Sequence, residues 1–257
     1  MKRSEHLRSQ WRKGHPTYGP FVQLPAPGMP EILAHAGFDF CIVDLEHGAI
    51  DLETAENMIR AANAAGIACI VRVTSNREEL IGKSLDFGAD GVHVPQVSTV
   101  EQAESAVRAS KFFPLGHRGV CPMVRAAKYS ADRSVYYDRS NRETMVILAI
   151  ESVDGIRNLP EIMRVKGVDA VFVGPYDLSQ SLGITGQVTH PEVVEKIREI
   201  SALCRQANLG LGTFVDSPEA ARQWVQHGIV YCCVDVDAAI MFKACKTYMN
   251  QLREGHT

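Results

Sequence analysis

Short runs of apolar residues alternate with longer amphipathic segments along almost the whole chain. Each apolar run has the length of a buried strand, and each amphipathic segment carries its apolar residues on one helical face. The predicted strands lie at residues 18–24, 38–43, 68–73, 91–94, 145–150, 170–173, 209–215 and 229–234. The predicted helices lie at residues 30–36, 52–65, 76–87, 99–110, 155–165, 191–207, 218–227 and 238–253. This alternation predicts a parallel sheet, because each helix returns the chain to the same edge of the sheet.

The number of strand–helix units indicates an α/β fold of the TIM (β/α)8 barrel type, which closes with eight strands. An open doubly wound sheet is the alternative, but no Gly-x-Gly-x-x-Gly motif follows the first strand. No linker or composition shift divides the chain, so we expect a single domain over residues 1–257. Residues 111–142 interrupt the rhythm, and long irregular segments of this kind are often functional.

Composition and charge favour a protein that acts on small molecules. The 257 residues carry a formal net charge of −3, which gives no electrostatic reason to expect nucleic acid or an anionic membrane as a partner. The basic first 16 residues lack the apolar core of a signal peptide, and no run approaches the roughly 20 apolar residues of a membrane span. We therefore expect a cytoplasmic location. The seven cysteines form no Cys-x-x-Cys motif, which indicates buried thiols rather than a disulfide or zinc framework.

Polar residues gather where the predicted strands end, and in a barrel these ends build the active site. The residues in question are Asp44, Glu46 and His47 after the second strand, Arg72 after the third, Glu151 after the fifth, Asp177 after the sixth, and Asp235 and Asp237 after the eighth. Glu151 and Asp177 are candidate metal ligands, because two hard carboxylates suit Mg²⁺ or Mn²⁺ better than zinc. The alternative is an exposed glutamate and an aspartate that caps a short helix.

The other strand-end residues also allow two interpretations. His47 could transfer protons near neutral pH, or it could be structural. Arg72 ends an apolar strand, so it needs either a salt bridge with Asp44 or Glu46 or a developing negative charge. A metal, an arginine and a histidine at one barrel mouth would polarise a 2-oxo acid and stabilise its enolate. This combination indicates carbon–carbon bond making or breaking.

Several collinear motifs give the chain a specific resemblance that covers nearly its whole length. These motifs are AGFDFCIVDLEHG, VRV, SLDFGADGVHVPQV, PLGHRGV, AIESVDGIRNLPEI, GVDAVFVGPYDLSQSLG and THPEV. They resemble the HpcH/HpaI aldolase family of class II, metal-dependent pyruvate aldolases, which includes 4-hydroxy-2-oxoheptanedioate and 2-keto-3-deoxy sugar acid aldolases. The resemblance implies reversible cleavage of a 4-hydroxy-2-oxo acid to pyruvate and an aldehyde through a metal-stabilised enolate. Mg²⁺ or Mn²⁺ is the implied ion, with Co²⁺ as a third candidate.

The resemblance also implies roles for individual residues. Glu151 and Asp177 would hold the metal, Arg72 would stabilise the enolate oxygen, and His47, paired with Asp86, would manage protons. The backbone around Gly174, Pro175, Tyr176 and Asp177 would receive the pyruvate carboxylate, Asp44 would support the histidine loop, and Arg125 would reach the site of an adjacent subunit. The pattern of residues alone would place Asp86 on the surface.

Relatives of this kind are homo-oligomers, so the resemblance implies a hexamer built as a trimer of dimers, or a smaller assembly. It further implies that the last helix, residues 238–253, is exchanged between neighbouring subunits. We expect Gln23, Leu24, Tyr176 and residues 214–217 to line the end of the site that receives the aldehyde.

Departures from the family pattern leave undetermined which aldehyde the protein accepts. Ala149 stands where many relatives have Gln, Tyr176 where they have a small residue, and Asp235 where they more often have Gly. Oxaloacetate decarboxylation or an acyl-CoA lyase reaction would use the same enolate chemistry. A Schiff-base aldolase would instead need a lysine such as Lys83 or Lys128. A non-catalytic barrel that binds small molecules is the alternative outside enzymes.

Overall fold

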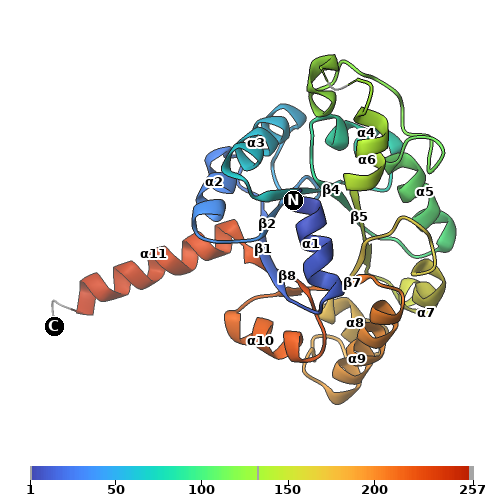
Figure 1. The fold of residues 1–257 in the computed structure, drawn as a ribbon. Helices are drawn as coiled ribbons and strands as arrows, with labels where there is room; N and C mark the ends of the chain where they lie inside the picture. Colours follow the sequence, from blue (N-terminus) through green and yellow to red (C-terminus); the bar gives the residue numbers. More distant parts are fainter. Residues whose placement is uncertain (1, 132, 255–257) are drawn as a thin grey trace.

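Eight parallel strands close into a barrel in chain order, with the last strand beside the first (Figure 1). The computed structural model describes residues 2–131 and 133–254. The strands are β1 (Thr17–Val22), β2 (Phe40–Asp44), β3 (Ala68–Arg72), β4 (Gly91–Val94), β5 (Met145–Ile150), β6 (Ala170–Val173), β7 (Gly210–Val215) and β8 (Tyr231–Val236). The predicted (β/α)8 barrel is therefore confirmed.

Helices surround this barrel and cover the outer face of its strands (Figure 1). They are α1 (Arg3–Arg12), α2 (Gly28–His35), α3 (Leu52–Ala65), α4 (Glu78–Asp86), α5 (Val100–Ser110), the 3-10 helix η1 (Arg125–Ser130), α6 (Tyr136–Glu143), α7 (Val153–Ile162), α8 (Pro175–Ser181), α9 (Pro191–Gln206), α10 (Pro218–Gln226) and α11 (Asp237–Glu254). Several begin at side-chain caps, as where Asp51 accepts a hydrogen bond from the Thr54 N–H and Ser152 accepts one from Gly155.

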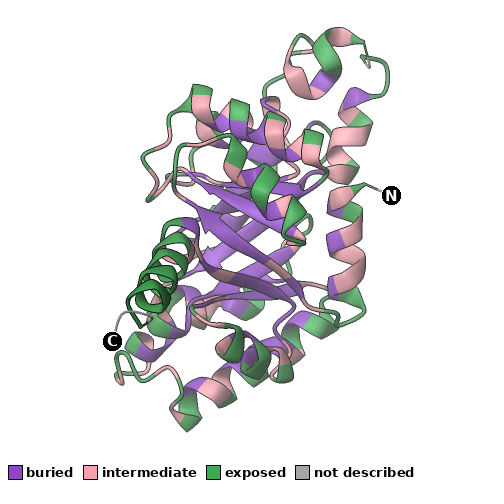
Figure 2. Cartoon of the chain, turned by 90° about the vertical axis from the view of Figure 1, so that its left-hand side faces the viewer, coloured by how far each residue is buried: buried purple, intermediate pink, exposed green. Residues whose placement is uncertain are grey.

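The strands are buried on both faces, which explains their nearly continuous apolar sequences. Every residue of β2 and of β5 is buried, and Figure 2 shows the barrel as the buried centre of the molecule. Phe40, Ile70 and Ile147 point into the barrel, whereas Val43 and Val71 pack against the helices. Burying each such side chain contributes roughly 1.5–3 kcal/mol, so the scaffold that carries the strand ends is rigid.

The first helix was not predicted, because α1 buries only Ser4, Leu7 and Trp11 and is otherwise polar. It lies across the amino end of the barrel (Figure 1). The Arg8 guanidinium pairs with Asp169 at 2.6 Å, and the Trp11 indole N–H donates to the Thr17 hydroxyl at 2.9 Å. Tertiary contacts therefore create this helix where its own apolar pattern is weak.

Residues 111–142, predicted to be irregular, contain η1 and all of α6 but its last residue, Glu143. The Lys111 ammonium group ties the segment together by donating to the backbone carbonyls of Asn141 at 3.0 Å and Thr144 at 2.6 Å. Phe112, Ala127 and Tyr136 form a small apolar cluster inside the segment. The segment is therefore a packed lobe rather than an open loop.

The final helix α11 projects away from the barrel (Figure 1), and Asp237 is its only buried residue. Its large exposed apolar side chains are Met241, Phe242, Tyr248, Met249 and Leu252. Within the described part of the chain, no helix is both long enough and apolar enough to cross a membrane.

Candidate active site

A cavity of about 770 Å³ opens at the carboxyl ends of the strands. It is lined by Phe21, Gln23, Glu46, His47, Arg72, Gln96, Ser98, Glu151, Ser152, Phe172, Gly174, Pro175, Tyr176, Asp177, Phe214 and Val236. These residues come from strands far apart in the sequence, because the parallel barrel brings all its carboxyl ends to one mouth. Of the residues expected at the aldehyde end, Gln23, Tyr176 and Phe214 lie in this lining, whereas Leu24 and residues 215–217 do not.

Arg72 is held by two carboxylates on the neighbouring strand and its following loop. Its Nε and Nη2 donate to the two oxygens of the fully buried Asp44 at 2.8 and 2.7 Å, and Nη1 lies 3.3 Å from Glu46. Burial favours the uncharged form of each group, but the ion pair outweighs it, so the pKa of Asp44 is lowered and that of Arg72 is raised. The salt bridge that the sequence left open is therefore made, with both acids.

Glu151 and Asp177 both line the cavity, and the pKa of each is raised. Burial, followed by the charge of Glu46, raises the pKa of Glu151, and Asp177 adds to this effect. Burial also raises the pKa of Asp177. The Gln96 N–H donates to Glu151 at 3.1 Å and partly offsets the cost. Two partly desolvated carboxylates with raised pKa values are an arrangement that a cation would stabilise.

The backbone at the start of α8 allows Asp177 to turn toward the cavity. Gly174 is the residue before the helix, and Asp177 lies in its first turn rather than at the capping position. A Cβ atom at Gly174 would collide with the Asp177 carboxylate. The lack of a side chain at Gly174 therefore leaves room for this carboxylate, and the alternative in which Asp177 caps the helix is not observed.

These donors fit a magnesium-type ion, which commonly uses one or two carboxylates and takes its other oxygen ligands from substrate and water. In the described part of the chain, no three His, Cys, Asp or Glu side chains are grouped as a self-sufficient metal cage. Glu151 and Asp177 would thus supply only part of a coordination sphere. This set suits an ion that also binds the reactant.

His47 stands at the rim with 63% of its side chain exposed, and its Nε2 lies 3.9 Å from a Glu46 oxygen. Asp86, its predicted partner, instead lies at the carboxyl end of α4, where the buried Arg118 donates to it at 2.6 Å. The fold of one chain does not bring Asp86 to His47. A His47–Asp86 pair would have to form between two chains.

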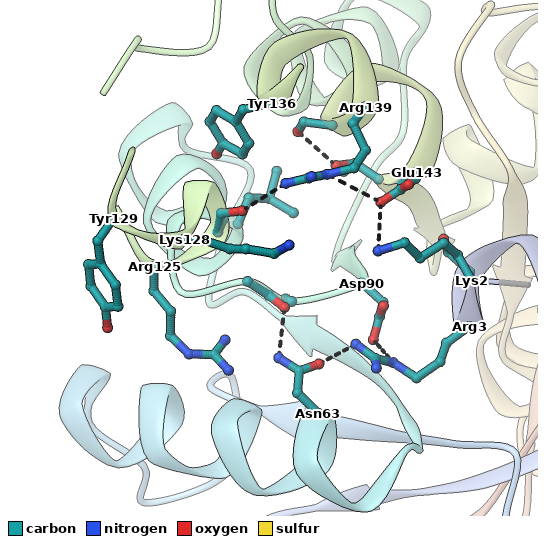
Figure 3. A pocket seen from close by; sticks show the side chains of 17 residues that line it. Lys2, Arg3, Asn63, Asp90, Arg125, Lys128, Tyr129, Tyr136, Arg139 and Glu143 are labelled. Atoms are coloured by element: carbon teal, nitrogen blue, oxygen red, sulfur yellow. Dashed lines mark hydrogen bonds and ion pairs between the residues drawn. The ribbon is translucent and has the colours of Figure 1, made fainter. Parts of the chain in front are cut away.

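Arg125 also lies away from this mouth. It lines a second cavity of about 410 Å³ at the amino end of the barrel, together with Arg3 and Asp90 (Figure 3). Its guanidinium donates to the Phe87 carbonyl at 2.6 Å. A role for Arg125 in substrate binding therefore also requires a neighbouring subunit.

Several residues of the mouth, including Gln96 and Phe172, were given no site role from the sequence, and Glu46 entered only as a possible salt-bridge partner of Arg72. Glu46 pairs with Arg72, and Gln96 reaches both Glu151 and Glu46. Phe172 packs edge-on against Phe21, with ring centroids 6.2 Å apart, and the Arg72 guanidinium lies 4.2 Å above the Phe21 ring. The position of Glu46 after a strand was a usable signal, whereas the contacts of Gln96 depend on its left-handed backbone, with φ of 55°.

Comparison with known proteins agrees with this geometry. The family model for HpcH/HpaI aldolase/citrate lyase matches residues 17–243. The chain is 33% identical over 235 residues to 2-dehydro-3,6-dideoxy-6-sulfogluconate aldolase of Pseudomonas putida, covering 91% of this chain and 92% of the relative. It is 31% identical over 241 residues to 4-hydroxy-2-oxo-heptane-1,7-dioate aldolase of Escherichia coli, covering 93% and 92%.

Solved structures give the same result. A HpcH/HpaI aldolase/citrate lyase family protein from Burkholderia cenocepacia superimposes with a TM-score of 0.89 at 33% identity, covering 96% of this chain and 99% of that one. The citrate synthase SbnG superimposes with a TM-score of 0.85 at 31% identity, covering 97% and 98%. The chain therefore belongs to the HpcH/HpaI aldolase/citrate lyase family and is an aldolase.

Proposed function

We propose that this aldolase cleaves a 4-hydroxy-2-oxo acid reversibly to pyruvate and an aldehyde, using a divalent metal ion. The supporting observation is that Glu151 and Asp177 share a cavity with Arg72, and that burial raises the pKa of both acids. A pure binding site has no need of two desolvated carboxylates beside a fixed arginine. Mg²⁺ or Mn²⁺ is the ion that suits these oxygen donors.

Glu151 and Asp177 would hold the metal. When bound, the metal supplies Lewis-acid polarisation of the 2-oxo group. Pro175 has no N–H, but the backbone N–H groups that follow it in the first turn of α8 have no carbonyl partner within the helix and would receive the substrate carboxylate. Arg72 lines the same cavity, so a substrate held in this way would have its 2-oxo group within the space that the guanidinium borders.

During cleavage, a base removes the C4 hydroxyl proton, the C3–C4 bond breaks, and negative charge develops on the 2-oxo oxygen. Arg72 is fixed by Asp44 and Glu46, so its guanidinium can face this charge without reorienting. His47 at the rim is the candidate for holding and moving protons. A proton delivered to C3 then completes pyruvate.

We also propose that the active enzyme is a homo-oligomer. Asp86 and Arg125 lie outside the mouth, so only a second copy could bring them to it. The exposed apolar residues of α11, such as Phe242 and Leu252, offer a surface for such a copy.

Exchange of the pyruvate methyl protons with deuterated water, followed by NMR, tests the enolate chemistry without any aldehyde. We expect metal-dependent exchange in the native protein and at least a 100-fold loss in Glu151→Gln. Asp154→Asn, which changes an exposed acid at the start of α7, is the matched control and should exchange normally. Absence of exchange in the metal-loaded native protein would refute the proposal.

A chelator separates this mechanism from imine chemistry. Undiminished exchange in EDTA would rule out the metal and direct attention to Lys83 or Lys128 as imine-forming residues. Oxaloacetate is a second candidate substrate, because its decarboxylation would pass through the same enolate, beside the same Arg72. Release of CO₂ from oxaloacetate in the same samples would measure that reaction.

A further inference from the structure

Gln23 connects the active-site arginine to the rest of the mouth. Its side-chain Nε2 donates to Asp44 Oδ2 at 2.9 Å, the same oxygen that accepts from Arg72 Nη2 at 2.7 Å. Asp44 Oδ1 meanwhile accepts from Arg72 Nε at 2.8 Å and from the Glu46 N–H at 3.1 Å. Asp44 is fully buried, so protein groups must satisfy all of its hydrogen-bonding capacity.

Removing the Gln23 amide would leave one lone pair of this buried carboxylate without a partner. Asp44 could recover a partner only by shifting, and Arg72 would shift with it because the two are joined by two hydrogen bonds. Burial raises the pKa of Asp44, but Arg72 and, to a smaller extent, the Gln23 hydrogen bond lower it. Gln23 therefore influences the position of the Arg72 guanidinium through Asp44, without contacting the guanidinium itself.

The backbone of Gln23 is itself fixed by the first residue of α11. Asp237 Oδ1 accepts from the Gln23 N–H at 3.0 Å, and Asp237 Oδ2 accepts from the Leu24 N–H at 3.1 Å. Asp237 is only 1% exposed and also accepts from the Ala238 N–H at 2.8 Å. A continuous set of hydrogen bonds thus runs from the base of the projecting helix through Gln23 and Asp44 to Arg72.

We propose that Gln23 is a positioning residue for Arg72, and that Asp237 sets Gln23 so that the attachment of α11 is coupled to the active site. This inference rests on the proposed enolate chemistry, in which Arg72 faces the developing charge. Gln23 also lines the cavity, so a simpler role is contact with the aldehyde alone. The two roles differ in a reaction that contains no aldehyde.

Exchange of the pyruvate methyl protons is that reaction. We expect Gln23→Leu, which keeps the side-chain volume but loses the donor, to lower the exchange rate constant about 10-fold or more, with a smaller change in the KM for pyruvate. Gln23→Glu places a second carboxylate against Asp44 and should lower the rate further. Gln206→Leu, at the exposed end of α9, is the matched control and should behave as the native protein.

Asp237→Asn tests the second link, because an amide offers one acceptor where the carboxylate offers two. We expect Asp237→Asn to lower the exchange rate constant, as Gln23→Leu does. In the double variant, the loss expressed as free energy should be smaller than the sum of the two single losses. Thermal unfolding of each variant checks that the barrel remains folded. A folded Asp237→Asn protein with native exchange would disprove the coupling to α11.

Native exchange in Gln23→Leu, with only the KM for the aldehyde altered, would overturn the positioning role. Absence of exchange in the native protein would instead count against the proposed function. In that case, a crystal structure of Gln23→Leu still decides the structural claim. An unchanged Asp44–Arg72 pair in that crystal would reject it, and a displaced guanidinium would support it.

Discussion

The buried charges of this protein differ in whether they have a partner of opposite charge. Asp44 and Arg72 pair through two hydrogen bonds, whereas Glu151 and Asp177 are two acids that line the same cavity. Asp44 and Arg72 neutralise each other's charge, whereas burial raises the pKa values of Glu151 and Asp177. Asp44 therefore fixes Arg72 in the site, whereas Glu151 and Asp177 are the acids that a cation would stabilise.

The sequence predicted Glu151, Asp177, Arg72 and His47 at one mouth, because carboxyl ends of parallel strands must meet there. It did not predict the role of Gln23, since nothing in a lone glutamine indicates that its amide will meet a carboxylate 21 residues away. Asp86 and Arg125 entered only through the family resemblance. Their roles stay predictions, because one chain places both outside the mouth.

Lys111 gives a pH-dependent prediction. Lys111 is 3% exposed, and burial lowers the pKa of its ammonium group to about 8. Because the unfolded chain holds this proton up to about pH 10.5, the unfolded state binds more protons between the two values, and the lysine's contribution to stability rises with pH. We expect the free energy of unfolding of the native protein to rise by about 1–3 kcal/mol relative to Lys111→Met between pH 8 and 10.5.

Urea unfolding of both proteins at several pH values measures this difference, and the titration of other groups cancels in the comparison. Parallel pH dependences would show that Lys111 has an ordinary pKa.

At the scale of elements, the sequence located strands and long helices well and missed those that depend on tertiary contacts. The helix α1 has too few apolar positions to show a period, and α6 buries only Tyr136. The predicted eighth strand, residues 229–234, continues to Val236, so Asp235 lies inside β8 with φ of 62°. An aspartate in this left-handed conformation is unusual, and its ion pair with Lys243 of α11, at 2.5 Å, could not be inferred from the sequence.

The projecting helix α11 should mediate assembly. Phe242 is 65% exposed on this helix, and burying it against another copy would contribute roughly 1.5–3 kcal/mol. We expect Phe242→Glu to weaken self-association at least 10-fold, measured as mass against concentration by light scattering after gel filtration. Lys246→Glu, on an exposed position of the same helix, is the control for the added charge. A native protein that remains monomeric at all concentrations would contradict this prediction.

For the whole molecule, closing the barrel brings several carboxylates to one mouth. Their mutual repulsion lowers the stability of the folded state, and a bound cation would offset it. A metal that binds only the folded state stabilises it by about 2.7 kcal/mol at 100 times its Kd. We therefore expect Mg²⁺ or Mn²⁺ to raise the Tm of the native protein by several degrees. Glu151→Gln should show little or no rise, and an equal rise in this variant would place the metal elsewhere.

The helix α1 lies over the amino end of the barrel (Figure 1). There the ring centroid of Tyr231 lies 5.3 Å from that of Trp11 and 4.7 Å from that of Phe40. A packed interior is not a channel, so reactants share a single entrance at the carboxyl ends of the strands. Arg72 is largely buried below this entrance, whereas Tyr176 stands near it with 54% exposure. The compound held against Arg72 must then enter first and leave last. We expect the aldehyde to depart before pyruvate, so that accumulated pyruvate, rather than aldehyde, occupies the free enzyme and slows the next turnover.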